Sequence, residues 1–330
     1  MISIYKIYIY LFIWSMLTGF FFISVFKKLS RRFSRLLSKG IPVVGGMSIT
    51  LTFIITLILG FSLFDKLNKD IWVIIFASLF MLFTGIYDDL RELTIFNKFL
   101  VQIIATSILI IFKIRTQIVG IGGTINLLIT FLWVIGITNA FNHLDIVDGL
   151  SGGVGFLIVI SFLIISILNN EPKAIIITLS LLGTLLSFLV YNLPPARIYL
   201  GNCGSHFLGF ILAILAILIS YASLDRKFAL LSPIFILGFP IYDTSFLIVM
   251  RLKNKRSIFK KSEDHLILRL LNQGYTLKKA VGYLFLFTLF FCVCGILISQ
   301  LSGWLSGAVV IFSIIIVSVF TIKILKTSNV

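Results

Sequence analysis

Polar side chains gather in one short stretch of this apolar chain, ITNAFNHLDIVDGLSGG, at residues 137–153. Asn139, Asn142, Asp145 and Asp148 are spaced three residues apart within it. If the stretch is helical, consecutive members of the series lie on one side, so the last three can face one ligand. The glycines that follow allow a sharp turn and a close approach of the backbone. A polar helix end would explain one Asn and one Gly, but not the whole set, and we interpret the stretch as part of a functional site.

A second acidic motif, GIYDDLREL at 85–93, follows an apolar run directly. Asp88 and Asp89 repel each other there, and a divalent cation such as Mg²⁺, which takes oxygen ligands, would relieve that repulsion. A solvated acidic loop is the simpler interpretation of a DD pair taken alone. Lys98 begins the next apolar run and is a candidate partner for a phosphate or a carboxylate. Lys39, beside a Pro/Gly turn, is a further candidate for an anion.

Two more segments carry residues that suit anionic ligands. The turn GNCGS at 201–205 suggests backbone N–H groups and a Ser205 N-cap at a helix start, which suits a phosphate, although an ordinary capped helix would have the same sequence. In the segment 260–280, His265 and Arg269 lie four residues apart, so a helix would place both on one face. That face either meets anionic groups or anchors the segment on the membrane surface.

The elements that must position these residues are membrane helices. The chain has 330 residues, 33 Phe and only 12% charged residues, with a mean hydropathy of +1.13, a composition typical of proteins in lipid. Eleven apolar runs approach the roughly 20 residues that a transmembrane helix needs. They lie at 5–26, 47–64, 71–87, 98–114, 125–141, 152–169, 173–191, 206–222, 228–250, 280–300 and 304–322. We expect an all-α polytopic membrane protein with about 11 transmembrane helices.

The basic residues predict the orientation in the membrane. Of the 28 Lys and Arg residues, 20 fall on the inner side if the N-terminus lies outside and the C-terminus is cytoplasmic. This asymmetry follows the positive-inside rule, so the net charge of +16 indicates contact with acidic lipid headgroups and not with nucleic acid. Residues 1–330 are expected to form one integral membrane domain. Its active site is expected in the cytoplasmic loops 27–46, 88–98, 142–151, 192–205 and 251–279.

Most of the scarce carboxylates fall at this predicted face. Only 12 Asp and Glu residues are present, and carboxylates at membrane depth are costly and usually functional. Eight of them lie at the inner ends of spans or in inner loops, namely Asp88, Asp89, Glu92, Asp145, Asp148, Asp243, Glu263 and Asp264. Carboxylates for a cation, glycine turns and basic residues at one face are the equipment of metal-assisted phosphoryl transfer. One substrate would come from the membrane and the other from the cytosol.

The ordered motifs PVVGG, GIYDDLREL, NAFNHLDIVDGLSGG, PARIYLGNCGS, PIYDT and EDHLILRLLNQG resemble the polyprenyl-phosphate N-acetylhexosaminyl-1-phosphate transferase family, glycosyltransferase family 4. The resemblance covers roughly 39–280 and favours the GlcNAc-1-phosphate transferase branch over the related phospho-MurNAc-pentapeptide transferase. It implies transfer of a sugar 1-phosphate, GlcNAc 1-phosphate first, from a UDP-sugar to undecaprenyl phosphate with release of UMP. This is the first membrane step of a cell-envelope polysaccharide such as an O-antigen, at the cytoplasmic face of the bacterial inner membrane. The resemblance also implies Mg²⁺, with Mn²⁺ as second choice, and leaves a homodimer open.

The resemblance implies roles for individual residues. The aspartate pair matches family residues assigned to the metal and to the lipid phosphate, and the Asn142–Asp148 element matches one linked to the nucleotide and to catalysis. The expected catalytic residues are Asp88, Asp89, Asp145 and Asp148. The expected substrate-binding residues are Lys39, Lys98, Asn142, Asn202, Gly204, Ser205, His265 and Arg269. The expected metal ligands are Asp88, Asp89 and Asn202.

Two departures from the family pattern bear on activity. Asn202 stands where the family usually has an Asp that ligates the metal, and His265 stands alone where other members carry several histidines. An amide oxygen can ligate Mg²⁺ but brings no charge. A catalytically impaired member of the family is therefore one alternative, and the peptidoglycan enzyme and a membrane transporter are the others.

Overall fold

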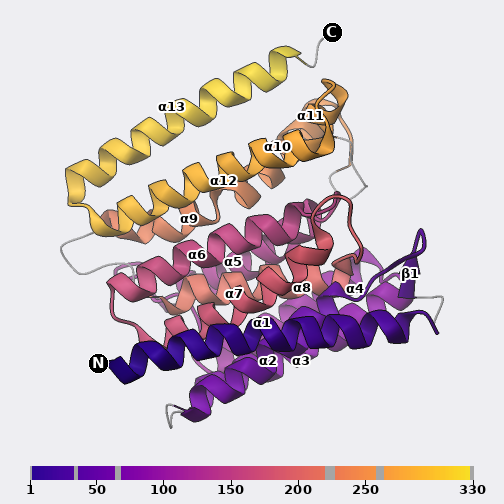
Figure 1. The fold of residues 1–330 in the computed structure, drawn as a ribbon. Coiled ribbons are helices and arrows are strands. Elements are labelled where there is room, and N and C mark those ends of the chain that lie inside the picture. The colour runs from indigo at the N-terminus through magenta and orange to yellow at the C-terminus, as the bar shows by residue number, and fades with distance from the viewer. Residues whose placement is uncertain (1, 33–35, 64–67, 220–226, 258–263, 328–330) are drawn as a thin grey trace. The chain divides into compact units, whose positions relative to one another are not determined.

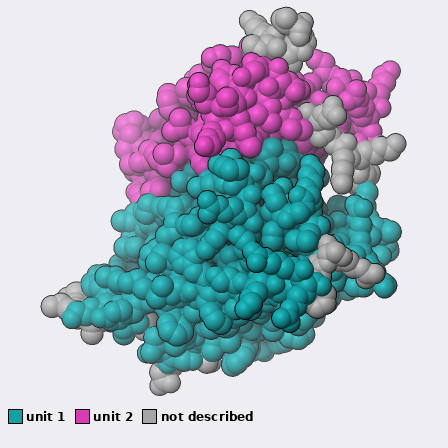
Figure 2. Space-filling model, turned by 45° about the vertical axis from the view of Figure 1, so that its right-hand side comes forward, with its two compact units in different colours: residues 1–219 teal, residues 220–330 magenta. Residues whose placement is uncertain are grey.

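Helices make up most of the described chain. The computed structural model describes residues 2–32, 36–63, 68–219, 227–257 and 264–327 (Figure 1). They belong to two compact units, Met1–Ile219 and Ser220–Val330, which Figure 2 colours separately. Each unit has its own core and is described by itself.

Unit 1 is a bundle of long helices that run along one another (Figure 1). Its helices are α1 (Ile2–Ser30), α2 (Gly45–Leu63), α3 (Lys69–Leu90), α4 (Ile95–Ile111), α5 (Gly123–Leu144), α6 (Leu150–Leu168), α7 (Pro172–Asn192) and α8 (Gly201–Leu218). A short hairpin, β1 (Leu37–Ser38) and β2 (Ile41–Pro42), lies between α1 and α2. Unit 2 contains η2 (Lys227–Leu231), α9 (Ser232–Ile236), α10 (Gly238–Lys253), α11 (Leu266–Asn272), α12 (Leu277–Gln300) and α13 (Gly303–Thr327).

The predicted all-α polytopic class is confirmed. Within the described residues, nine helices are long and apolar enough to cross a membrane, or ten if a bent pair in unit 2 is one span. The remaining predicted span corresponds to α4, which is apolar but has 17 residues. Each of the eleven predicted runs therefore has a helical counterpart. The orientation with the N-terminus outside stays a prediction.

The predicted span at 228–250 is not one continuous helix. It bends by 72° between Phe228–Ile236 and Gly238–Lys253. Pro240 lies in the first turn of α10 and has no N–H to donate to the carbonyl of Ile236, which interrupts the helix there. Gly238 also lies so close to the ring of Phe291 that a Cβ would be 2.3 Å from it.

Two central helices organise unit 1. The helix α7 packs against α1, α2 and α6, and α8 packs against α2, α3 and α5. Both have mostly buried side chains, including Phe188 of α7 and Phe207 and Phe210 of α8. Hydroxyl groups inside the bundle bond to backbone carbonyls, as in Ser15 Oγ to Ser180 O at 2.6 Å, because the membrane interior offers no water to satisfy them.

The first turn of α8 is reached by two other helices through glycines. A Cβ on Gly46 of α2 would lie 2.2 Å from the backbone nitrogen of Gly204. A Cβ on Gly85 of α3 would lie 2.5 Å from the Cα of Cys203. Real Cβ atoms do not come this close to backbone atoms, so only glycine lets α2 and α3 approach the start of α8. This close packing places the end of α3 beside the residues 201–205.

Backbone hydrogen bonds hold the segment before α2 onto the segment before α8. The N–H of Tyr199 donates to Pro42 O at 2.8 Å, and the N–H of Gly45 donates back to Tyr199 O at 2.9 Å. The N–H of Gly46 then donates to Leu200 O at 2.9 Å. The PVVGG motif therefore pairs through its backbone with the segment before α8 and aligns the start of α2 with the start of α8.

We predict that Gly46→Ala lowers the stability of unit 1 by roughly 3 kcal/mol, the upper end of the cost of overpacking, because the new methyl group meets backbone and not a movable side chain. Thermal unfolding of the purified protein in detergent measures the effect. Gly136→Ala in α5 is the matched control, since no atom lies within 4 Å of its added Cβ. Equal unfolding temperatures for the two variants would contradict the close α2–α8 contact.

Candidate functional site

The carboxylate of Asp89 binds the start of α8. The N–H of Asn202 donates to Asp89 Oδ1 at 2.8 Å, and the N–H of Cys203 donates to Asp89 Oδ2 at 3.1 Å. The first amides of a helix have no partner within the helix and carry partial positive charge, so a carboxylate there is stabilising. Gly201, with φ of +74°, lets Asp89 come this close, because a Cβ would lie 2.8 Å from Oδ2. Asp89 thus occupies the amides that the sequence suggested for a phosphate.

The neighbouring Asp88 is tied to Lys98. The Nζ of Lys98 lies 2.8 Å from Asp88 Oδ2, and the N–H of Leu93 donates to Asp88 Oδ1 at 2.7 Å. The Asp88 side chain is 1% exposed and that of Lys98 is 20% exposed. Such a buried pair is costly to break by removing one partner, about 3–5 kcal/mol. The predicted alternative that Lys98 meets a carboxylate is confirmed, and its partly exposed ammonium group can also meet a phosphate.

An amide and hydroxyl network links α5 to α8. The Nδ2 of Asn142 donates to Asn202 Oδ1 at 3.2 Å and to Ser205 Oγ at 3.0 Å. Asn202 is therefore placed between Asp89, through its backbone, and Asn142, through its side chain. The predicted N-cap role of Ser205 is wrong, because α8 begins at Gly201 and Ser205 lies inside it. Gly204 contributes the close contact with Gly46 described above.

The helical interpretation of the whole 137–153 stretch is also corrected. The helix α5 ends at Leu144, and Asp145 follows as its C-cap. Asp148 lies in the turn before α6, and Gly149 there has φ of +78°, which ends regular helix geometry. The three-residue spacing therefore does not place Asp145 and Asp148 on one helix face. The turn, and not a helix, brings them to the site.

The Asp145 carboxylate faces other acids. Burial, followed by the like charges of Asp89 and Asp148, raises its pKa to about 7. Among the described aspartates of this cluster, Asp145 alone makes no side-chain hydrogen bond to a described residue. Its oxygens are the ones least committed to holding the fold together.

Asp148 holds the loop that leads to α8. The N–H of Ala196 donates to Asp148 Oδ2 at 2.9 Å. Asn192, which the sequence analysis did not select, completes this link: its Oδ1 accepts from the N–H of Gly149 at 3.0 Å, and its Nδ2 donates to Ile198 O at 2.9 Å. A lone Asn at the end of an apolar run gave no signal for this role, which depends on two distant backbone groups.

Two of the polar residues singled out by sequence lie apart from this cluster. Asn139 forms an amide pair with Gln102 of α4, with Nδ2 donating to Oε1 at 2.7 Å. It stabilises the contact of two helices inside the membrane. Lys39 is exposed at the tip of the β1–β2 hairpin, with φ of +50°. Within the described chain, its side chain makes no ion pair.

His206 is a buried residue of the site that the sequence analysis missed. It follows Ser205 in α8 and is 7% exposed. Its Nε2 has no hydrogen-bond partner among the described residues. Lys98, Asp88 and His143 are the ionisable groups that act on it. The signal available in the sequence was weak, namely one of 3 His in the chain placed next to the GNCGS turn.

The remaining predicted residues belong to unit 2. His265 Nδ1 lies 3.0 Å from Asp243 Oδ2 in α10, and both residues are buried. The N–H of Leu266 donates to Asp243 Oδ1 at 3.1 Å, so Asp243 holds the start of α11. Arg269 pairs with Asp264 at 3.3 Å and lies over the ring of Phe246. Glu263 lies outside the described residues.

The oxygen donors of unit 1 fit a divalent cation in their chemistry. The carboxylates of Asp89 and Asp145 act on each other as like charges, and the amide oxygen of Asn202 belongs to the same network. Mg²⁺ takes such oxygens and commonly binds through one or two carboxylates together with water and substrate phosphates. No trio of His, Cys, Asp or Glu among the described residues is arranged to hold a metal by itself, and this mode of binding does not require one.

The chain is similar in sequence to known sugar 1-phosphate transferases. Residues 71–220 match the family described as Glycosyl transferase family 4, and they include Asp88 and Asp89 of α3, the 137–153 stretch and α8. The chain is 28% identical over 289 residues to a probable undecaprenyl-phosphate N-acetylglucosaminyl 1-phosphate transferase of Bacillus subtilis, covering 85% of this chain and 80% of that protein. It is 29% identical over 263 residues to an undecaprenyl-phosphate alpha-N-acetylglucosaminyl 1-phosphate transferase of Thermotoga maritima, covering 76% and 78%. It is 27% identical over 202 residues to a phospho-N-acetylmuramoyl-pentapeptide-transferase of Limosilactobacillus reuteri, covering 55% and 62%.

We predict that Asp148→Asn and Asp148→Ala differ in the loop that precedes α8. Asn keeps an oxygen that can accept from the N–H of Ala196, whereas Ala leaves that buried donor without a partner, at a cost of about 1–3 kcal/mol. Hydrogen exchange should therefore be faster at Ala196 in Asp148→Ala and nearly unchanged in Asp148→Asn. Fast exchange in both variants would show that the charge of Asp148, and not its acceptor oxygen, holds the loop.

Proposed function

We propose that this chain, which belongs to glycosyl transferase family 4, transfers N-acetylglucosamine 1-phosphate from a UDP-sugar to undecaprenyl phosphate. The observation that carries the proposal is the convergence of Asp88, Asp89, Asn142 and Asp145 around the first turn of α8, inside the residues that match the family. The cluster lies at the ends of the candidate membrane spans α3, α5 and α8, which suits an acceptor that is itself a membrane lipid. The product would begin a cell-envelope polysaccharide.

The proposed reaction exchanges one phosphoanhydride bond for another. An oxygen of the lipid phosphate attacks the phosphorus that carries the sugar, and a new P–O–P bond forms. The bond from that phosphorus to the bridging oxygen breaks, and UMP leaves with the bonding electron pair. Because both partners are anions, catalysis must come mainly from positioning and from neutralising charge.

The residues of unit 1 suit these tasks. Lys98 presents a partly exposed ammonium group whose position is fixed by Asp88. It can therefore bind a phosphate oxygen at little further cost in side-chain entropy. Asn142 is held between Asn202 and Ser205 and has a side-chain oxygen left for a donor group of the substrate. Asp145 is the carboxylate with free hydrogen-bonding capacity, and it lies within reach of the charges of Asp89 and Asp148. His206 lies beside the Lys98–Asp88 pair.

A bound Mg²⁺ would supply charge neutralisation at the phosphates. Asp89, Asp145 and Asn202 are the residues proposed to hold it. Asp88 is already neutralised by the ammonium group of Lys98, whereas Asp89 is held only by backbone N–H groups and keeps its charge for a cation. Asp88 then contributes by orienting the lysine, and it can join the metal if that ion pair opens.

The cytoplasmic side of a bacterial inner membrane is the proposed location of the reaction. Contacts in unit 1 bring together the four loops 27–46, 88–98, 142–151 and 192–205, which the positive-inside rule assigns to the cytoplasm. UDP-sugars are made in that compartment. The relatives named as pentapeptide transferases make UDP-MurNAc-pentapeptide the second donor to test.

We predict that Asp145→Asn lowers UMP release by on the order of 100-fold or more, measured with undecaprenyl phosphate, UDP-GlcNAc and Mg²⁺. This variant removes a charge without removing a side-chain hydrogen bond to the described protein, so its fold should be intact. Asp88→Asn and Asp89→Asn should be equally inactive, but they also disturb the contacts with Lys98 and α8, and their unfolding temperatures must be measured alongside. Asp70→Asn is the control, because the Asp70 side chain is 47% exposed and its ion pair with Lys173 is long, at 4.0 Å. Wild-type turnover by Asp145→Asn would remove it from the site.

We predict that Asn202→Asp keeps activity and lowers the Mg²⁺ concentration needed for half-maximal rate. A carboxylate at this position can still accept from Asn142 Nδ2, and it adds a negative charge beside Asp89 and Asp145. Titration of the rate with Mg²⁺ for the variant and for wild type gives the comparison. Complete loss of activity at every Mg²⁺ concentration would mean that the amide itself has a distinct role.

A further inference from the structure

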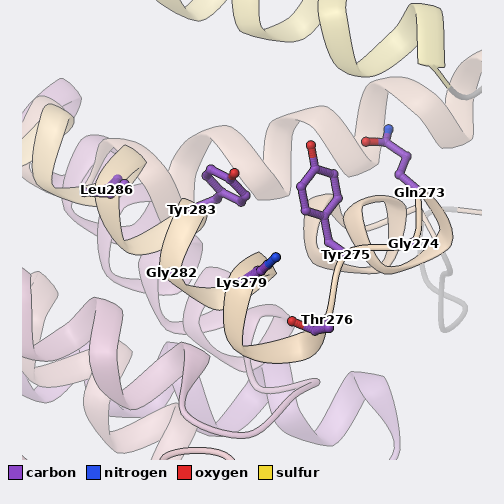
Figure 3. Close-up of a pocket in the computed structure, with 8 residues that line it drawn as sticks. All are labelled: Gln273, Gly274, Tyr275, Thr276, Lys279, Gly282, Tyr283 and Leu286. Carbon is purple, nitrogen blue, oxygen red and sulfur yellow. The ribbon is translucent and has the colours of Figure 1, made fainter.

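A groove on unit 2 lies at the point where α12 leaves the α11–α12 turn. Its volume is about 750 Å³. Its lining side chains come from the turn and from the first turns of α12 (Figure 3). The main contributors are Tyr275, Thr276, Lys279, Gly282, Tyr283 and Leu286. None of these residues belongs to the proposed reaction site.

The lining residues of α12 follow one face of the helix. Lys279, Gly282, Tyr283 and Leu286 have the spacing i, i+3, i+4 and i+7. The opposite face, with Ala280, Val281 and Leu284, is buried in the unit. At 1.5 Å per residue, the stripe extends about 10 Å along the helix from Lys279 to Leu286. It passes from a cation to an aromatic ring and then to an aliphatic side chain.

This order matches the layers of a membrane surface. The helix α12 is one of the candidate membrane spans, and Lys279 is its third residue. Lysine at a span end reaches the headgroups, and Tyr is typical of the interface between headgroups and hydrocarbon. Leu286 is 64% exposed, as expected of a side chain that faces lipid tails. The groove therefore begins at headgroup level and opens toward the hydrocarbon.

The polar groups of the groove have free capacity for an anion. Within the described residues, Lys279 makes no ion pair, and the hydroxyl groups of Tyr275 and Tyr283 make no hydrogen bond. The two rings form an edge-to-face pair with centroids 5.3 Å apart, which restricts the orientation of both tyrosine side chains. Gly282 keeps the floor open, since no atom lies within 4 Å of an added Cβ.

We propose that this groove binds one anionic phospholipid, with its phosphate at Lys279 and the tyrosine hydroxyl groups and an acyl chain along Gly282 and Leu286. Charge selects the headgroup, because a lysine near the surface contributes about 1 kcal/mol toward an anionic lipid. The apolar end favours a lipid over a soluble phosphate, because only a lipid can occupy the polar and the apolar parts of the groove with one molecule. The proposed occupant is a phospholipid of the bilayer and not the acceptor lipid that the reaction consumes.

The test is native mass spectrometry of the whole protein released from phosphatidylcholine nanodiscs that contain phosphatidylglycerol. Wild type should retain one phosphatidylglycerol more than Lys279→Gln. Lys279→Gln should also require about a fivefold higher phosphatidylglycerol fraction for half occupancy. Gly282→Leu, which fills the floor of the groove and keeps all charges, should lose the same lipid.

Lys278→Gln is the matched control. Lys278 is the exposed neighbour of Lys279, carries the same charge and does not line the groove. Retention of the extra lipid in this variant supports a defined groove, whereas equal loss in both lysine variants would overturn the proposal in favour of a diffuse basic surface. Undecaprenyl phosphate added to wild type distinguishes the two lipid sources. Displacement of phosphatidylglycerol at equal amounts would overturn the assignment, because the groove would then hold the acceptor substrate.

Discussion

The contact between the Asp89 carboxylate and the first amides of α8 is the interaction on which the rest of the site depends. It joins residues 113 positions apart in the sequence, and it lies where Gly46 and Gly85 bring α2 and α3 against the first turn of α8. The turn carries Asn202 and Ser205, and Asn142 of α5 reaches both. If the Asp89 carboxylate were removed by substitution, two N–H groups at the start of a buried helix would lose their hydrogen-bond acceptor, and the position of Asn202 would no longer be fixed.

The carboxylates of the site have two roles: they hold structural elements in place, and they supply negative charge. Asp88 binds Lys98, Asp89 binds the first amides of α8, and Asp148 binds the N–H of Ala196. These three carboxylates therefore stabilise the fold and also contribute negative charge to the site. Asp145 contributes charge alone. Asp145 is therefore the residue whose substitution tests catalysis most directly, because it changes the charge of the site and leaves the described hydrogen bonds in place.

The sequence was sufficient for the membrane helices and for the carboxylates that converge in unit 1, since apolar run length and scarce carboxylates are strong signals. It missed Asn192 and His206, and it selected Lys39, which lies apart. The sequence did not predict which contacts bring the carboxylates together. The N–H groups that hold Asp89 and Asp148 belong to Asn202, Cys203 and Ala196, and backbone donors leave no mark in a sequence. The even spacing from 139 to 148 suggested one helix face, whereas Asn139 turns to Gln102 and Asp148 lies beyond the helix end. The break at Leu237 had a signal in Gly238 and Pro240, but the surrounding apolar run is long enough for one span and predicts one.

The central claim is that this chain moves a sugar together with its phosphate onto a lipid phosphate. The most direct measurement is the mass of the lipid product formed by the purified protein from undecaprenyl phosphate, UDP-GlcNAc and Mg²⁺, with identification of the released nucleotide. We expect a lipid diphosphate that carries one N-acetylhexosamine, formed in equal amount to UMP. A lipid monophosphate sugar accompanied by UDP would contradict the claim, as would the absence of any glycolipid with every UDP-N-acetylhexosamine offered.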